Sequence, residues 1–101
     1  MPTNTTALFR GAATTTVGTT LYTVPSGRTA IVSNIAVTNT SGSAQTFTIA
    51  LNGTALHTTA ALAANSTAYI DLKQVLAATN TITGGASATS VNFHISGIEV
   101  F

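Results

Sequence analysis

The feature that most constrains this chain is a period of two in its apolar residues. Between residues 29 and 39 the odd positions Ile31, Ile35 and Val37 share one face, interrupted by Ser33, and the even positions form a weaker, mixed face. Residues 46–51 alternate in the same way. Because successive side chains of a strand point to opposite faces, this alternation predicts half-buried β-strands. No stretch shows a helical period of comparable strength.

Turn signals separate these strands. Val24-Pro25-Ser26-Gly27 fits a type I turn, because proline presets φ at the second position and glycine often fills the fourth. Asn52-Gly53 predicts a two-residue hairpin with a type I′ turn, since both central residues of that turn need positive φ. After the hairpin we expect a returning strand over 54–59, a loop over 60–65 and a strand over 67–72. The inward residues of that last strand are predicted to be Ala68, Ile70 and Leu72.

The rest of the chain is less regular. We expect one helical turn over 73–78, a short strand over 79–83 and a flexible loop, GGASATS, over 84–90. In the final segment the apolar residues change parity, from odd (Val91, Phe93, Ile95) to even (Ile98, Val100). One extra residue near Ser96-Gly97, a β-bulge, would return all five to the core face. The alternative is a strand that crosses between two sheets at that point.

Short strands divided by turns predict an all-β protein: an antiparallel β-sandwich, jelly-roll-like, with about eight strands. We expect a single domain, with an N-terminal arm and first short strand over 1–18 and the sandwich over 19–101. The chain has no cysteine, so packing must hold it together. The predicted core includes Ile31, Ile35, Val37, Phe47, Ile49, Leu51, Ile70, Phe93 and Ile95.

Charge is scarce. Only 5% of the residues are charged, where an ordinary domain has about 25%. The cations are Arg10, Arg28 and Lys73, and three scattered cations form no basic patch, so we expect no nucleic-acid partner. Two interpretations of the composition stay open, and they are compatible: compositional drift, helped by the preference of threonine for strands, and a surface that lies against other subunits.

The N-terminal residues lack the pattern of a signal peptide, and no apolar stretch approaches the roughly 18 residues of a membrane helix. We therefore expect a protein made in a cytoplasm, with no membrane partner.

Residues that carry chemistry are few. His57, His94, Asp71 and Glu99 show no metal-ligand spacing, and the two carboxylates would be the only available glycosidase pair. No Gly-x-Ser-x-Gly elbow, phosphate loop or dinucleotide fingerprint is present. We therefore predict no catalytic, cofactor-binding or metal-binding residues, no cofactor, and a protein that is not an enzyme. His94, between Phe93 and Ile95, is expected to point outward or across a subunit contact.

Two tyrosines are the remaining candidates for binding. Tyr22 and Tyr69 could act as sugar-stacking platforms, as in carbohydrate-binding modules, although one or two aromatic residues on strands more often pack against their neighbours. An aromatic cluster around either residue, in a polar groove, would favour sugar binding. A broad, flat, uncharged face would favour assembly with other subunits.

The segments LYTVPSGRTAIVSNIAVTNTSGSAQTFTIAL and LAANSTAYIDLKQVLAATNTITG resemble the small β-sandwich virion proteins of tailed bacteriophages, which are decoration or tail-associated proteins. The likeness runs from about Thr19 to Phe101. Its shared motifs are turn and core positions, so it transfers no functional residue.

The resemblance implies a structural protein of the virion, made in the bacterial host cytoplasm. In its most direct form this is a capsid decoration or cement protein that binds the assembled particle as a homo-oligomer, with a trimer as the favoured form. Its partners would be copies of itself and the major capsid or tail protein. The alternatives are a tail, neck or baseplate component, or a carbohydrate-binding module for host attachment.

Overall fold

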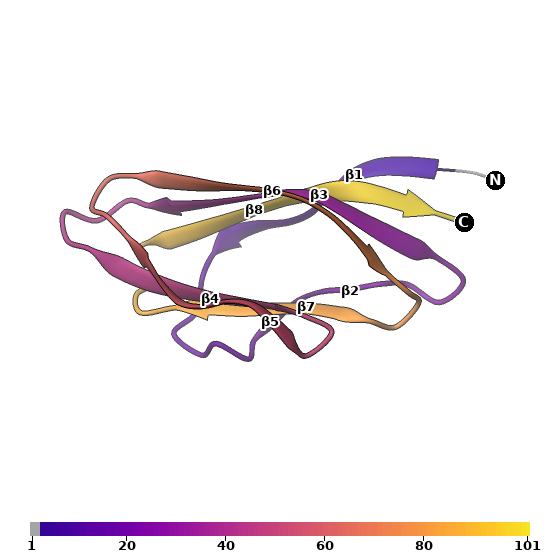
Figure 1. Ribbon diagram of the computed structural model, residues 1–101, viewed down its shortest axis with the longest axis horizontal. Coiled ribbons are helices and arrows are strands. Elements are labelled where there is room, and N and C mark those ends of the chain that lie inside the picture. The colour runs from indigo at the N-terminus through magenta and orange to yellow at the C-terminus, as the bar shows by residue number, and fades with distance from the viewer. Residues whose placement is uncertain (1–2) are drawn as a thin grey trace.

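The structure, a computed structural model, describes residues 3–101 as eight antiparallel strands in two facing sheets (Figure 1). One sheet has the strand order β1-β8-β3-β6 and the other has the order β2-β7-β4-β5. The strands are β1 (Thr3–Ala12), β2 (Thr20–Thr23), β3 (Thr29–Asn39), β4 (Gln45–Leu51), β5 (Thr54–Leu62), β6 (Thr67–Leu76), β7 (Thr81–Ala86) and β8 (Val91–Val100).

The strand order is that of a jelly roll. Within residues 3–101, β4 and β5 are the one pair of strands that are neighbours both along the chain and in a sheet; every other connection crosses to the opposite sheet. Such winding of eight strands into two packed antiparallel sheets defines the jelly-roll architecture. The predicted fold class is therefore confirmed. None of the described residues forms a helix that could cross a membrane.

One of the two predicted turns is confirmed, and the type I turn predicted over residues 24–27 is wrong. Asn52 and Gly53 both have positive φ, 49° and 80°, as a type I′ hairpin requires. At the other turn the backbone N–H of Arg28 donates to the carbonyl of Pro25 at 3.2 Å. That turn therefore begins at Pro25, and Gly27, with φ 80°, takes the third position, where a type II turn needs glycine.

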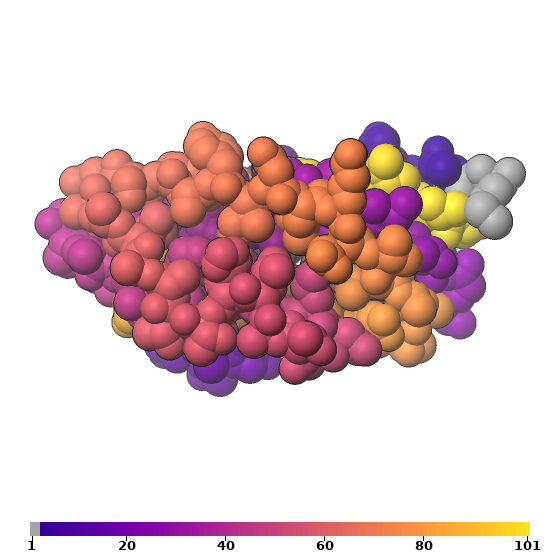
Figure 2. Space-filling view, viewed as in Figure 1, coloured from indigo at the N-terminus to yellow at the C-terminus, as the bar shows by residue number. Residues whose placement is uncertain are grey.

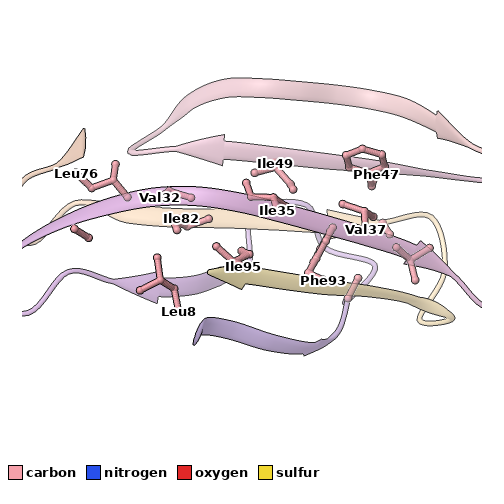
Figure 3. Close-up of a cluster of buried hydrophobic side chains, with 14 of the residues drawn as sticks. Leu8, Val32, Ile35, Val37, Phe47, Ile49, Leu76, Ile82, Phe93 and Ile95 are labelled. Atoms are coloured by element: carbon pink, nitrogen blue, oxygen red, sulfur yellow. The ribbon is translucent and has the colours of Figure 1, made fainter. Parts of the chain in front are cut away.

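Most of the predicted core is buried between the sheets (Figure 3). Leu51 and Ile70 are half-buried and pack against it. Ile31 was placed in the core by its odd position, and this is wrong, because it lies half-buried on the outward face, opposite Ile98. The predicted core residues that are fully buried are Ile35, Val37, Phe47, Ile49, Phe93 and Ile95.

The β-bulge predicted in the last strand is wrong, and so is its alternative. β8 stays in one sheet and alternates without interruption, so that Gly97 and Glu99 face inward while Ile98 and Val100 are half-buried on the outward face. The extra residues lie in the neighbouring strands, at Ser33 in β3 and between Ala7 and Phe9 in β1. The shift at Ser33 moves the inward parity of β3 from even to odd, which explains the position of Ile31.

Segments predicted as irregular are longer strands. The residues expected as an N-terminal arm, from Thr3 onward, pair with β8 along all of β1; Met1 and Pro2 lie outside the described residues. The helical turn over 73–78 is wrong, since β6 continues to Leu76. Residues 60–62 extend β5, and residues 84–86, expected in a flexible loop, are buried in β7. Hydrogen bonding to a neighbouring strand fixes these polar and glycine-containing segments, whose composition alone favours loops.

Candidate functional site

A buried carboxylate joins the two sheets near the end of the molecule where the chain termini lie (Figure 1). Glu99, on the inward face of β8, is 6% exposed. The Tyr22 hydroxyl, from β2 in the other sheet, donates to Glu99 Oε2 at 2.5 Å, and Arg28 Nη1 donates to Oε1 at 2.9 Å. The Arg28 guanidinium lies 4.0 Å from the ring centre of Phe101, a cation–π contact. We call these four residues the Glu99 cluster.

The contacts fix the charge states of the cluster. The hydrogen bond from Tyr22, supported by Arg28, lowers the pKa of Glu99 even though burial opposes this. Burial and the hydrogen bond to Glu99 raise the pKa of Tyr22 well above its usual range. At neutral pH the carboxylate is ionised and the phenol is protonated, so neither group is tuned for proton transfer near neutral pH. The cluster ties the sheets together.

The other titratable candidates lie on different surfaces. His57, on β5, packs its ring against Phe47, with ring centres 5.6 Å apart. His94 is on the outward face of β8, as predicted, opposite Ala36 and Arg10. Asp71, on the outward face of β6, accepts a hydrogen bond from the side-chain amide of Asn34 at 3.2 Å. Across residues 3–101 no three histidine, aspartate or glutamate side chains group closely enough to hold a metal ion.

The two tyrosines have different surroundings. Tyr22 is half-buried and committed to Glu99, so its ring is not a free platform. Tyr69 is 74% exposed on the outward face of β6. The register places Ala36, His94 and Arg10 in the same row across the sheet. This row contains no second tyrosine, phenylalanine or tryptophan that could form an aromatic cluster with Tyr69.

The outward face of the β2-β7-β4-β5 sheet has no charged side chain at the positions that the register assigns to it. Phe47, Ile49 and Ile82 point inward, so their neighbours point outward. Apart from Gly85, those residues are threonine and alanine: Thr20, Thr23, Thr46, Thr48, Ala50, Ala55, Ala61, Thr81 and Thr83. We call them the threonine–alanine face. A Cβ on Gly85 would come within 2.6 Å of the Thr16 carbonyl oxygen, so the β1–β2 loop crosses this face closely there.

The charges that are not part of the Glu99 cluster gather on the opposite sheet. Arg10, on β1, and Asp71, on β6, lie at outward positions of the β1-β8-β3-β6 sheet, and Lys73 is exposed on the same strand as Asp71. The two faces of the sandwich are therefore chemically distinct.

The open side of the sandwich lies between β5 and β6, which are edge strands of different sheets (Figure 2). A groove of about 370 Å³ runs between them, and its lining includes Leu51, Leu56, Gln74 and Leu76. A second depression, of about 480 Å³, is lined by Ser33, Asp71, Leu72 and Lys73, where the pairing of β3 with β6 is irregular. Both depressions adjoin β6.

No protein-family model matches the chain, and no curated protein sequence matches it.

Sequence reasoning missed the Glu99 cluster, although a signal for it was present. Val91, Phe93 and Ile95 are inward at odd positions, and uninterrupted alternation places Glu99 inward as well. A buried carboxylate needs a cation or strong donors, and this chain offers three cations. The assumed bulge hid this signal, because it turned Glu99 outward.

Proposed function

We propose that this protein is a non-enzymatic structural protein of a tailed-bacteriophage virion, a capsid decoration protein that binds the surface of the assembled particle as a homo-oligomer. The observation that carries the proposal is the threonine–alanine face. Two central strands and both edges of one sheet present hydroxyl and methyl groups without charge. Such a face can be covered by another protein without the desolvation cost of buried ions, which is several kcal/mol each.

The size of the molecule supports the same function. The described residues measure 45 × 21 × 18 Å, and one side of a sandwich this small offers an area comparable to the roughly 800 Å² per partner of a standard interface. The threefold form of the oligomer rests on the sequence resemblance alone.

The test is co-sedimentation of purified protein with emptied capsids and, separately, with isolated tails of the phage that encodes it. Binding to capsids is the expected result. Thr83→Lys places one charge at a half-buried, outward position of the central strand β7, and it should abolish binding. Asn92→Lys is the matched control, because it adds the same charge on β8, on the outward face of the other sheet, and should leave binding intact.

Binding to tails alone would replace decoration by a tail, neck or baseplate role. Binding to neither particle, by a folded protein, would contradict the proposal. Equal effects of the two lysine substitutions would remove the threonine–alanine face as its basis.

Sugar binding is a second candidate, and Tyr69 is the observation that favours it, because an aromatic ring that is 74% exposed can stack on a pyranose. Glycan-array binding that Tyr69→Ala abolishes would support a host-attachment module instead.

A further inference from the structure

The free edge of β6 has a self-complementary sequence. β6 pairs with β3 on one side, and among residues 3–101 no strand pairs with its other side. Its outward positions are occupied by Thr67, Tyr69, Asp71, Lys73 and Val75 in turn. Tyr69 and Val75, 74% and 67% exposed, are the two most exposed large hydrophobic residues of the described chain.

We propose that a second copy of this chain pairs antiparallel with β6 about a twofold axis at Leu72. In that register the residue k positions after Leu72 lies opposite the residue k positions before it. Asp71 therefore faces Lys73 of the second copy, and Tyr69 faces Val75 of the second copy. The axis repeats both pairs, so four outward cross-strand pairs form, two between opposite charges and two between apolar side chains.

Directly opposed residues of an antiparallel pair have their Cβ atoms about 4.5–5.5 Å apart, close enough for an ion pair or an apolar contact. The two most exposed hydrophobic side chains are then covered by each other, and the free N–H and C=O groups of the edge gain partners. The contact is isologous, so it closes at two copies and does not propagate into a fibre.

Charged residues on an edge strand commonly prevent pairing with other strands. Here the two charges have opposite signs and stand two positions apart on one face. In the twofold pairing each charge therefore lies opposite its counter-charge, and the charges favour this one register over others. A pairing shifted by two residues along the strand would lose the match of both charges and of both apolar residues.

The other edges suit pairing less well. β2 has four residues. β5 has two register irregularities, and its Thr59 has φ 48°. β1 has a single charge, Arg10, and a register shift between Ala7 and Phe9. β6 is ten residues long. Its pairing with β3 shifts register once, opposite Ser33, but on both sides of that shift its even positions face inward and its odd positions face outward.

The pairing does not depend on the proposed virion function. It uses the β6 edge, whereas particle binding uses the threonine–alanine face of the other sheet. A twofold pair also differs in mass from the threefold cluster that the resemblance implies.

The first experiment measures mass by sedimentation equilibrium. The wild-type protein should reach twice the 10.1 kDa of one chain. Lys73→Asp sets aspartate against aspartate at both charged pairs, and Asp71→Lys sets lysine against lysine. Each should weaken the dimer by about tenfold or more. The double variant D71K/K73D restores both opposite-charge pairs and should restore the dimer. Arg10→Asp makes the same charge change on the other edge strand of the sheet and should leave the dimer unchanged.

Circular dichroism checks that each variant is folded. We expect folded variants, because Asp71 and Lys73 are both exposed. A folded wild type that stays monomeric, a trimer, a dimer indifferent to the single substitutions, or a double variant that remains dissociated would each overturn the proposal. A monomer that still binds capsids would overturn the pairing and leave the virion function standing. A dimer that binds neither capsids nor tails would overturn the virion function and leave the pairing standing.

The second experiment fixes the register. The chain has no cysteine, so Asp71→Cys and Lys73→Cys proteins can be prepared separately and mixed under mild oxidation. Opposed Cα atoms of an antiparallel pair are about 4.5–5.5 Å apart, within the range that a disulfide bridges. The mixture should form a disulfide-linked dimer faster than either protein alone. Faster cross-linking within one variant would contradict the axis at Leu72.

Discussion

Tyr22 and Glu99 meet inside the sandwich, with the hydroxyl of Tyr22 2.5 Å from Oε2 of Glu99, although 77 positions separate them in the chain. Tyr22 belongs to the four-residue edge strand β2, which has β7 as its one described neighbour in its sheet, and Glu99 belongs to β8, an inner strand of the facing sheet. The bond therefore fastens a short edge strand to the other layer, and Arg28, the residue before β3, reinforces it.

This arrangement predicts a specific acid sensitivity. The pKa of Glu99 is lowered from its ordinary value of 4.5, so its ionised form contributes stability that is fully present above pH 4.5 and is lost as the pH falls through the lowered pKa. Chemical denaturation at several pH values should show the free energy of unfolding falling below pH 4.5. Glu99→Gln should be less stable at pH 7, by about 1–3 kcal/mol, and should lose most of this acid dependence.

Asp71→Asn is the control, because it removes the other acidic side chain of the chain from an exposed position. It should keep the acid dependence. If Glu99→Gln retained the full slope below pH 4.5, the stabilising role assigned to the ionised carboxylate would be contradicted.

The sequence predicts those parts of the fold that depend on local signals. Alternation in residues 46–51 places Phe47 and Ile49 in the core, and Asn52-Gly53 specifies its own turn type because both residues adopt positive φ. Eight short amphipathic strands can bury one face of every strand by forming two antiparallel sheets that pack against each other.

The errors occur where a residue's position depends on a neighbouring strand. Parity read along β3 misplaces Ile31, because the shift at Ser33 is visible only in the pairing with β8. The same cause places the predicted bulge on the wrong strand and hides the inward position of Glu99. The Gly84-Gly85 pair has the composition of a loop, yet both residues are buried in β7. Contacts between distant segments decide these positions, and periodicity within one segment carries no information about them.

Gly97 should tolerate no side chain. A Cβ at this position would overlap the carbonyl oxygen of Ile31 and lie 3.0 Å from Leu8 Cδ1, because the irregular segments of β3 and β1 both close in on β8 here. The backbone of β3 cannot move aside as a flexible side chain can. Gly97→Ala should therefore lower the free energy of unfolding by about 3 kcal/mol. Gly42→Ala, where nothing lies within 4 Å, should change it by less than about 0.5 kcal/mol. Urea denaturation measures both, and equal small effects would contradict the close approach.

Thr79 offers a stabilising substitution. It has φ 70° at the third position of a turn closed by a hydrogen bond from Asn80 N–H to the carbonyl of Ala77, at 3.0 Å. A β-branched residue in this conformation costs about 1–3 kcal/mol, and glycine removes that cost while adding entropy to the unfolded chain. Thr79→Gly should therefore raise the free energy of unfolding by about 1 kcal/mol. Thr89→Gly, at an exposed threonine without positive φ, should lower it slightly. A lower thermal midpoint for Thr79→Gly would contradict the assigned backbone strain.

Asn39 holds two loops together at the end of the sandwich opposite the Glu99 cluster. It is 0% exposed, and its side-chain Nδ2 donates to the carbonyl oxygens of Ser43 at 2.8 Å and Ala63 at 3.2 Å. Its Oδ1 accepts hydrogen bonds from the backbone N–H and the hydroxyl of Ser41, at 3.0 and 2.8 Å.

Asn39→Asp preserves the shape of the side chain and the acceptor toward Ser41, but it replaces the donor with a charged oxygen that faces carbonyl oxygens. A buried charge without a cation, set against acceptors, should lower the free energy of unfolding by about 3 kcal/mol or more at pH 7. Asn92→Asp, the same change at a half-buried outward position of β8, should cost less than about 1 kcal/mol. Thermal denaturation of the two variants side by side makes the comparison, and a similar loss in both would mean that the amide of Asn39 does not fasten these loops.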